Sequence, residues 1–261
     1  MGIRMKRVML EIAYDGTNYC GWQIQPNGIT VEEVLNKALT ELLKEQIVVI
    51  GASRTDSGVH ALANVAVFDT NTKIPGEKIS FALNQRLPKD IVIQKSREVP
   101  LDFHPRYCNS RKTYEYRILN NRFPIPTERL YSYFIYYPLD TDAMKKAAEY
   151  LVGEHDFKSF CSNRTQVVDT IRTVYDINIE RDKDMIDITI SGNGFLYNMV
   201  RIIVGTLVKV GLGVYPPEHV KEILEKKDRM AAGPKAPAQG LMLKYIEYPD
   251  LEAENLYHIK K

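Results

Sequence analysis

The chain has 261 residues, with 35 Lys and Arg against 33 Asp and Glu, 44% hydrophobic residues and 26% charged residues. These proportions are typical of a folded globular protein, and they exclude intrinsic disorder and collagen-like or low-complexity fibres. A formal net charge of +2 is too weak to attract a polyanion, so any nucleic-acid site must come from local clusters of basic residues.

Cysteine usage and the apolar tracts indicate where the chain resides. It contains three widely spaced cysteines, Cys20, Cys108 and Cys161. An odd number at this spacing predicts neither a disulfide framework nor a paired-thiolate metal site, and it favours a reducing cytoplasm. We expect no secretory signal, because residues 1–16 reach two carboxylates before any long apolar run. Residues 195–215, the longest apolar tract, contain an asparagine, an arginine and a lysine, which favours a buried helix over a membrane span.

The first half of the chain predicts the order βαββαβ. Residues 8–14 alternate in polarity and reach a turn at Asp15 and Gly16, which is typical of a half-buried strand. Thr30 and Glu33 form a capping box ahead of a helical apolar pattern over 31–43. The rest of this half is predicted as a strand at 47–50, a polar loop at 53–58, a strand at 65–68, a helix at 77–85 and a strand at 91–93.

The second half repeats this order approximately. It is predicted as a strand at 113–119, a helix capped by Asp140 or Thr141 and ending near 152, strands at 174–179 and 185–190, helices at 195–210 and 218–225, an ordered loop at 226–240, and a strand at 241–248. We therefore expect an α+β fold of two ferredoxin-like (βαββαβ) halves, with mainly antiparallel sheets that meet at a central active-site cleft. The expected domains are 1–106 and 107–250, followed by a short tail at 251–261.

Several familiar sites are absent from the sequence. Neither G-x-x-x-x-G-K-[ST] nor G-x-G-x-x-G occurs, so chemistry that depends on a nucleotide is not expected. The five histidines are widely separated, and no pair has the helical spacing of metal ligands. We therefore expect no cofactor and no metal.

The segment 51–61, G-A-S-R-T-D-S-G-V-H-A, places Arg54 and Asp56 in a tight polar loop directly after a predicted strand. The residues alone leave two interpretations open. Ser, Thr, Asp and Gly form turns in which the aspartate accepts backbone N–H bonds. The same loop also suits a firmly positioned charged site.

Residues 53–61 resemble the R-T-D-x-G-V-H signature of the TruA family of tRNA pseudouridine synthases. Five more segments resemble motifs of this family in the family's order. They are Y-D-G-T-x-Y-x-G-W-Q at 14–23, K-T-Y-E-Y-R at 112–117, G-E-H-D-F-K-S-F-C at 153–161, F-L-Y-N-M-V-R-I-I-V-G at 195–205, and A-P-A-Q-G-L at 236–241.

The resemblance implies isomerisation of uridine to pseudouridine at positions 38, 39 and 40 in the anticodon stem-loop of tRNA. The N1–C1′ glycosidic bond breaks and C5 bonds to C1′, with no cofactor. Cleavage of such a bond calls for a carboxylate beside the anomeric carbon, and Asp56 matches the family's catalytic residue. Two routes stay open: Asp56 attacks C1′, or it removes the C2′ proton to give a glycal.

The resemblance also assigns roles to other residues. Arg201 matches the ionic partner of the acid, although it also reads as an ordinary helix arginine. Tyr114 matches the pyrimidine-side group that accepts the C5 proton, although it also reads as a packed strand aromatic. Arg54 resembles the residue that holds the flipped-out position. Further candidates are Thr55, His60, Lys112 and Arg111 for RNA binding or base flipping, and Leu241 with Tyr114 for the substrate pocket.

Three basic clusters are candidate contacts to the RNA backbone, although each also reads as solvated surface charge. They are Arg4, Lys6 and Arg7; Arg106, Arg111, Lys112 and Arg117; and Lys226, Lys227, Arg229 and Lys235. By resemblance the enzyme is a cytoplasmic homodimer whose partner is tRNA, with no membrane association. One subunit helps to hold the RNA for the other.

Two alternatives from other classes remain. A non-catalytic RNA-binding protein of two ferredoxin-like halves would bind tRNA by stacking without changing it. A glycosidase that acts on RNA would release free uracil. The Arg54–Asp56 loop favours the synthase over passive binding.

Overall fold

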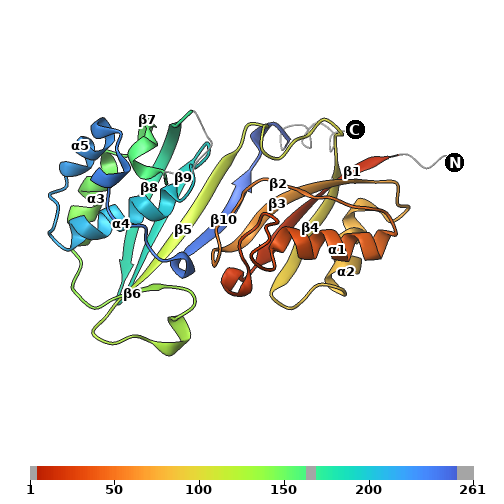
Figure 1. The fold of residues 1–261 in the computed structure, drawn as a ribbon, viewed down its shortest axis with the longest axis horizontal. Coiled ribbons are helices and arrows are strands. Elements are labelled where there is room, and N and C mark those ends of the chain that lie inside the picture. Colours follow the sequence, from red (N-terminus) through yellow and green to blue (C-terminus); the bar gives the residue numbers. More distant parts are fainter. Residues whose placement is uncertain (1–4, 163–168, 252–261) are drawn as a thin grey trace. The chain divides into compact units, whose positions relative to one another are not determined.

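A computed structural model describes residues 5–162 and 169–251 of the chain (Figure 1). The chain divides into two compact units. The first unit comprises residues 5–110 together with 243–251, and the second comprises residues 111–242. The chain thus returns to its first unit at Leu243, whereas the sequence pattern grouped residues 107–250 together.

The first unit contains an antiparallel sheet and two helices. Its elements are β1 (Lys6–Tyr14), α1 (Val31–Leu43), β2 (Ile50–Gly51), β3 (His60–Thr70), α2 (Ile79–Asn84) and β4 (Ile91–Val99). β1 lies between β4 and β3, and β2 pairs with β3. The elements follow the predicted order, and the structure confirms the polar loop between β2 and β3, which places residues 52–59 at one end of both strands.

The helices cover one face of this sheet. The Thr30 side chain accepts a hydrogen bond from the Glu33 N–H, so the predicted cap at the start of α1 is confirmed. On α2, the Ser80 N–H donates to Ser96 Oγ on β4 (2.9 Å). Ser96 lies opposite Leu10 of β1 in the register. Leu10 and its side of the sheet therefore face α2, which in turn contacts α1.

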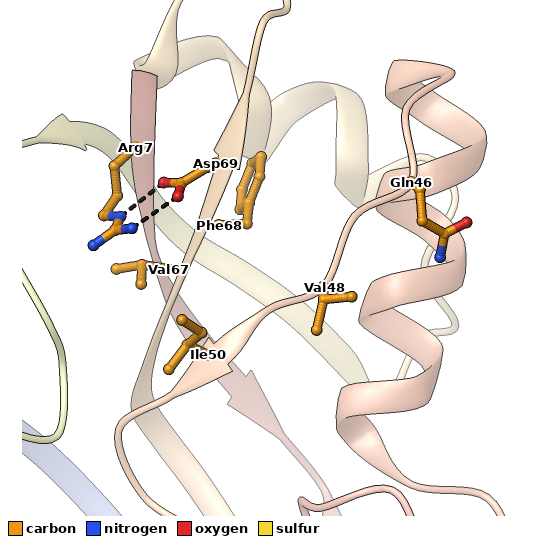
Figure 2. A pocket seen from close by; sticks show the side chains of 7 residues that line it. All are labelled: Arg7, Gln46, Val48, Ile50, Val67, Phe68 and Asp69. Atoms are coloured by element: carbon orange, nitrogen blue, oxygen red, sulfur yellow. Dashed lines mark hydrogen bonds and ion pairs between the residues drawn. The ribbon is translucent and has the colours of Figure 1, made fainter. Parts of the chain in front are cut away.

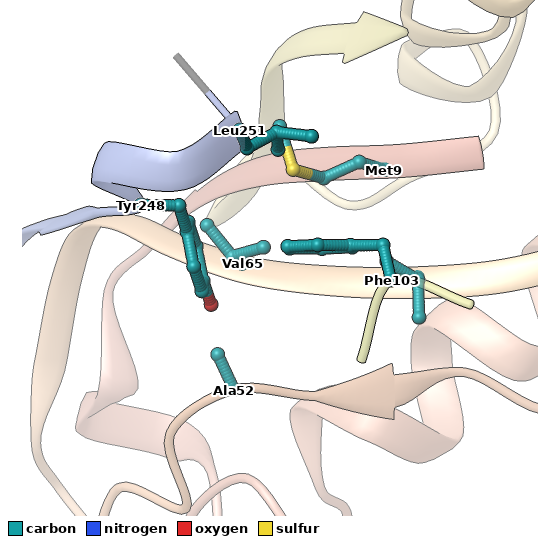
Figure 3. Packing of buried hydrophobic residues seen from close by; sticks show 7 residues of the cluster. Met9, Ala52, Val65, Phe103, Tyr248 and Leu251 are labelled. Carbon is teal, nitrogen blue, oxygen red and sulfur yellow. The ribbon is translucent and has the colours of Figure 1, made fainter. Parts of the chain in front are cut away.

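The opposite face of the sheet packs against the returning chain (Figure 3). Phe103 and Tyr248 meet edge to face, with their ring centroids 5.0 Å apart. The Tyr248 hydroxyl donates to the Pro105 carbonyl (2.8 Å). Leu251, which the sequence placed at the start of a tail, is buried in this cluster with Met9. The rest of the expected tail, 252–261, lies outside the described residues.

The strand predicted at 47–50 is wrong in extent, because β2 contains only Ile50 and Gly51. Two side chains of α1 accept hydrogen bonds from backbone N–H groups that a longer strand would pair with its neighbour. The Ile47 N–H donates to Thr40 Oγ1 (3.1 Å) and the Val49 N–H donates to Asn36 Oδ1 (2.8 Å). Ile47 and Val49 are therefore buried in a connection bonded to the helix, whereas Val48 between them is exposed.

The second unit is also a mixture of strands and helices. Its elements are β5 (Arg111–Asn120), β6 (Tyr133–Ile135), α3 (Thr141–Glu149), β7 (Gly153–Asp156), β8 (Ile171–Asp182), β9 (Met185–Gly192), α4 (Met199–Gly211) and α5 (His219–Lys226). The antiparallel order is β5-β9-β8-β7, and β6 pairs in parallel with β5. Helices α3, α4 and α5 lie together beside these strands (Figure 1). β10 (Leu241–Glu247) begins in this unit and continues into the first.

Single residues set the start of two helices in the second unit. The Asp140 side chain accepts hydrogen bonds from the N–H groups of Asp142 and Ala143, so Asp140 and not Thr141 caps α3. The helix predicted from residue 195 begins only at Met199, because Asn198 adopts a left-handed φ of 62°. Across residues 5–162 and 169–251, no helix combines the length and apolar character that crossing a bilayer requires.

Candidate active site

Asp56 lies at the start of a tight turn in the loop between β2 and β3. Its carbonyl accepts the Val59 N–H (3.1 Å), and Gly58 supplies the left-handed φ of 76° that the turn requires. Asp56 is half-buried, and its neighbour Arg54 is exposed. The loop thus directs charged groups outward from the end of a buried sheet.

The backbone of residues 16–22 holds this loop in place. A Cβ added to Gly16 would lie 2.0 Å from the Val59 carbonyl oxygen, and one added to Gly21 would lie 2.6 Å from that of Thr55. The Trp22 N–H donates to the Thr55 carbonyl (3.0 Å). Two main-chain segments thus touch without intervening side chains, which fixes the backbone immediately before and after Asp56. The 14–23 motif therefore has a structural role in this unit.

A buried hydrogen-bond network supports the same loop from below. The Tyr14 and Thr55 hydroxyls bond to each other (2.7 Å). Asn64 Nδ2 donates to the Ser53 carbonyl (3.0 Å) and to the Tyr14 hydroxyl (3.3 Å). Tyr14 on β1 and Asn64 on β3 therefore tie the loop to the sheet on both sides of Arg54. The sequence assigned no role to Asn64, and its place as a polar residue on an apolar strand offered the only signal.

His60 lies beneath the loop and is only 3% exposed. Its Nδ1 accepts the Gly16 N–H (3.1 Å). Thr55 is buried as well. In this structure the two residues support the loop, whereas Arg54 presents its guanidinium to solvent.

Arg201 occupies the first turn of α4 in the second unit and is 8% exposed. This burial excludes the reading of an ordinary surface arginine. Its Nε donates to the Ala236 carbonyl (2.8 Å), and one terminal amino group donates to Asn198 Oδ1 (3.2 Å). The guanidinium is therefore held in one orientation by a loop and by the residue that starts the helix.

The loop at 226–240 is ordered, as predicted, because it is bonded to α4. A Cβ on Gly205 would lie 1.7 Å from the Pro234 carbonyl oxygen. The Gly233 N–H donates to Thr206 Oγ1 (2.9 Å), and the Ala236 N–H donates to the Arg201 carbonyl (3.0 Å). Absence of a side chain at residue 205 lets the loop lie directly on the helix and reach Arg201.

Tyr116 is a residue of this region that the sequence analysis missed. Its hydroxyl donates to the Pro237 carbonyl (2.8 Å). Burial raises the pKa of Tyr116 above its ordinary value, and the charge of Arg201 opposes part of that rise. Tyr116 therefore lies near Arg201 and anchors the loop that contacts it. Its place on β5, two residues beyond Tyr114 and on the same face, was the available signal.

Tyr114 is buried on β5, and its ring meets Phe195 edge to face at 5.3 Å. Leu241, at the start of β10, is buried as well. Arg111 begins β5 and lies 5.5 Å from the centre of the Tyr175 ring, and Lys112 follows it, half-buried. In this unit the predicted residues thus fall on β5, on α4 and at the end of the 226–240 loop.

Comparison with known proteins identifies the family. The family model described as tRNA pseudouridine synthase matches residues 11–108 and 147–249. A tRNA pseudouridine synthase A of Thermoanaerobacter sp. (strain X514) is 55% identical over 244 residues, which are 94% of this chain and 100% of the relative. Proteins named tRNA pseudouridine synthase A 2 from Clostridium perfringens (strain 13 / Type A) and tRNA pseudouridine synthase A from Brevibacillus brevis are 49% and 48% identical over the same shares. This chain belongs to the tRNA pseudouridine synthase family.

The segments that match the family contain the two charged groups described above. Asp56 lies in the first matched segment and Arg201 in the second, whereas Tyr114, Arg111 and Lys112 lie between them. Among the described residues, no three His, Cys, Asp or Glu side chains are grouped as a metal ion would require. Arg4 of the first basic cluster lies outside the described residues.

A hollow of about 210 Å³ occurs elsewhere on the first unit of this synthase (Figure 2). It is lined by Arg7, Gln46, Val48, Ile50, Val67, Phe68 and Asp69. The Arg7 guanidinium donates to both carboxylate oxygens of Asp69, at 2.7 and 2.8 Å. The charged groups of the hollow thus satisfy each other. Arg7 of the first basic cluster lines it, but none of the residues predicted for catalysis, base flipping or the substrate pocket does.

Proposed function

We propose that this chain isomerises uridine to pseudouridine at positions 38, 39 and 40 in the anticodon stem-loop of tRNA, with Asp56 as the essential carboxylate. The reaction class, isomerisation in tRNA, follows from membership of the family. The observation that carries the assignment of Asp56 is its loop, which main-chain contacts fix on both sides of the carboxylate.

The proposed reaction breaks the N1–C1′ bond and joins C5 of the uracil to C1′. Positive charge develops on the sugar as the first bond breaks, so an ionised carboxylate beside C1′ stabilises the transition state. Asp56 either attacks C1′ or removes the C2′ proton. On both routes C5 loses its proton after the new bond forms and N1 gains one; on the glycal route the C2′ proton is also returned, so the product has the composition of the substrate. No nucleotide, metal or redox cofactor takes part.

We assign Arg201 as the ionic partner of Asp56. A buried guanidinium is costly unless an anion compensates it, and an adjacent cation keeps a carboxylate ionised. The support is the burial of Arg201 and the hydrogen bonds to Ala236 and Asn198 that orient its guanidinium. A helix that held the guanidinium loosely would serve this role poorly.

We assign Tyr114 as the group that accepts the C5 proton, in a substrate pocket that includes Leu241. The reacting nucleotide must leave the helical stem, and Arg54, exposed beside Asp56, is suited to hold its vacated position. Arg111 and Lys112 are suited to the RNA backbone, because cations that contact phosphates bind without reading sequence. Thr55 and His60 contribute through the loop that they support.

The proposal includes two ferredoxin-like halves that meet at a central cleft and a homodimeric, cytoplasmic enzyme. Support for the fold is the βαββαβ order of the first unit and the antiparallel sheet of each unit. The bacterial relatives named for tRNA modification and the three free cysteines support the cytoplasm. The homodimer rests on the family resemblance.

Nucleotide mapping tests the function. Bulk tRNA that lacks the modification is incubated with the full chain, pseudouridine is located by position, and free uracil is measured in parallel. We expect pseudouridine at 38, 39 and 40 and no released base. Free uracil would show the glycosidase, and salt-sensitive tRNA binding without modification would show the RNA-binding protein.

A further inference from the structure

The turn at 104–108 in the first unit displays an aromatic ring. The N–H groups of Tyr107 and Cys108 donate to the His104 carbonyl (3.2 and 3.1 Å). The rings of His104 and Tyr107 stack with centroids 4.1 Å apart and an angle of 21° between their planes. Tyr107 is nevertheless 82% exposed, which makes it the most exposed aromatic residue in the described chain. One face of its ring rests on His104, and the other is open to solvent.

The backbone fixes the ring that supports Tyr107. The Arg106 N–H donates to His104 Nδ1 (3.2 Å), so this nitrogen accepts and carries no proton. Burial, followed by the charge of Arg106, lowers the pKa of His104, which favours the same neutral form. A neutral imidazole held by the main chain is a flat and rigid support.

Arg106 connects this turn to the Asp56 loop. Its Nε donates to the Gly51 carbonyl (2.8 Å), at the end of β2. Burial is the main cause that lowers the pKa of Arg106, and the positive charge of Arg54 is the second. Arg54 lies three residues beyond Gly51, in the loop next to this bond, and its positive charge opposes that of Arg106. Within the part of the chain that the structure describes, neither guanidinium group makes an ion pair, and the Arg106 side chain bonds to the protein through Nε alone.

Two adjacent unpaired guanidinium groups beside an open aromatic face match the chemistry of a nucleotide. A phosphate oxyanion relieves the repulsion between two cations, and arginine binds phosphate through paired N–H groups. An exposed aromatic ring stacks on a base without selecting its sequence. A purely structural turn would require no exposed tyrosine and would not bring two cations together.

We propose that Arg106 binds a phosphate of the RNA backbone next to the position that Arg54 holds, and that the open face of Tyr107 stacks on a base next to the reacting uridine. The inference rests on the proposed function, since RNA is the ligand. It extends that function by assigning Arg106, Tyr107 and the supporting His104 to a nucleotide platform beside the Asp56 loop. These residues bind substrate and take no part in the bond changes.

The test measures the affinity for unmodified tRNA over a range of salt concentrations, in an Asp56→Asn background so that the substrate is not consumed. Arg106→Gln is expected to weaken binding about tenfold and to reduce the slope of log affinity against log salt by about one. Arg106→Lys retains the charge and is expected to keep the slope. Tyr107→Ala is expected to weaken binding about tenfold with the slope unchanged, whereas Tyr107→Phe retains the affinity.

Matched controls come from α2 and the residues directly after it in the same unit. Arg86 donates to the Ala82 carbonyl (2.9 Å), and Phe81 is 68% exposed. Arg86→Gln and Phe81→Ala are expected to leave both affinity and slope unchanged. On the active chain, Arg106→Gln and Tyr107→Ala are expected to raise KM and leave kcat within about twofold, because they remove binding that ground and transition state share.

An unchanged salt slope in Arg106→Gln, or equal affinities for Tyr107→Ala and Tyr107→Phe, would overturn the platform. Losses as large in the two controls would overturn it too. Failure of the proposed function is a separate result: the chain with Asp56 intact would then form no pseudouridine, while the affinity measurements would still decide whether the platform binds RNA.

Discussion

The two units hold their key charged groups in different ways. In the first unit, the loop of Asp56 is fixed by main-chain segments that touch at Gly16 and Gly21. In the second, Arg201 extends from a buried helix and is fixed by acceptors on Ala236 and Asn198. The difference follows from the lengths of the two side chains. A short side chain must be positioned through its backbone, whereas a long one must be oriented along its length.

This contrast predicts different sensitivities in the two units. The first should respond most to any atom inserted between the touching backbones. The second should respond to the loss of hydrogen-bond acceptors around the guanidinium. Each of the first three variants below has a control substitution with a similar local perturbation but no link to the site.

The largest effect is expected from Gly21→Ala. Gly21 has a φ of 84°, and the new Cβ would lie 2.6 Å from the Thr55 carbonyl oxygen. We expect the loop to shift and the rate of pseudouridine formation to fall about a hundredfold, because small displacements of reacting groups are costly. Gly213→Ala is the control, because φ is 70° there and nothing lies within 4 Å of the added Cβ.

Both variants carry the strain of a left-handed alanine, about 1 to 3 kcal/mol, which urea unfolding measures. Only Gly21→Ala should lose activity beyond the loss explained by unfolded protein. Equal activities in the two folded variants would show that contact at Gly21 does not position Asp56.

A smaller effect is expected from Asn198→Gly. Glycine keeps the left-handed backbone, but it removes the acceptor of Arg201 and the hydrogen bond that Asn198 donates to Ser162 Oγ. We expect about a tenfold loss in kcat/KM, which corresponds to one misdirected hydrogen bond to a charged group. Lys183→Gly is the control, since Lys183 is exposed with a φ of 54°. Steady-state kinetics that show parent-like activity for Asn198→Gly would refute the orienting role.

Tyr14→Phe should have a weaker effect still. It removes the hydroxyl that bonds to Thr55 and Asn64, and we expect a loss of about 1 to 2 kcal/mol in the free energy of unfolding with a few-fold loss in kcat. Tyr19→Phe removes a comparable bond, to Asp90 Oδ1 (2.7 Å), and should lower stability alone. Kinetics and urea titration on both variants check this. Similar kcat losses in the two would mean that the Tyr14 network does not act on the loop.

The smallest effect is expected for an ion pair of the first unit at the end of β1 opposite the Asp56 loop. Lys6 Nζ lies 2.8 Å from Glu98 Oε1, and this hydrogen bond, opposed by partial burial, lowers the pKa of Glu98 below 4.5. A lowered folded-state pKa stabilises the protein above the unfolded value, and the stabilisation is lost as the pH falls through the folded value. Relative to Glu98→Gln, the parent should be more stable by less than about 1 kcal/mol at neutral pH. This difference should vanish in acid. Urea unfolding at several pH values measures it, and a difference that grows in acid would contradict the assignment.

Local patterns predicted much of the fold. The capping box at Thr30 and the alternating residues 8–14 are signals that neighbouring residues carry by themselves. The errors arose where individual hydrogen bonds or the backbone conformation of one residue decide. The short β2 depends on Asn36 and Thr40 taking backbone donors, and the late start of α4 depends on the backbone of Asn198.

The candidate site divides in the same way. The resemblance of the sequence motifs to those of the family pointed to Asp56 and Arg201. The contacts that position these two residues could not be predicted from the sequence. Gly21 and Thr55, like Tyr116 and Pro237, are far apart in the sequence and meet only in the fold. Hydrogen bonds to backbone carbonyls, such as that from Arg106 to Gly51, cannot be predicted from residue types, because every residue has a carbonyl.

The most direct test of the central claim is tritium release from tRNA labelled at uridine C5. Asp56→Asn keeps the size and polarity of the side chain and removes the negative charge. Asp142→Asn, at an exposed position in the first turn of α3, is the matched control. We expect Asp56→Asn to release label at least about a thousandfold more slowly than the parent, with unchanged unfolding. Asp142→Asn should match the parent. Release by Asp56→Asn at the parent rate would contradict the assignment of this carboxylate.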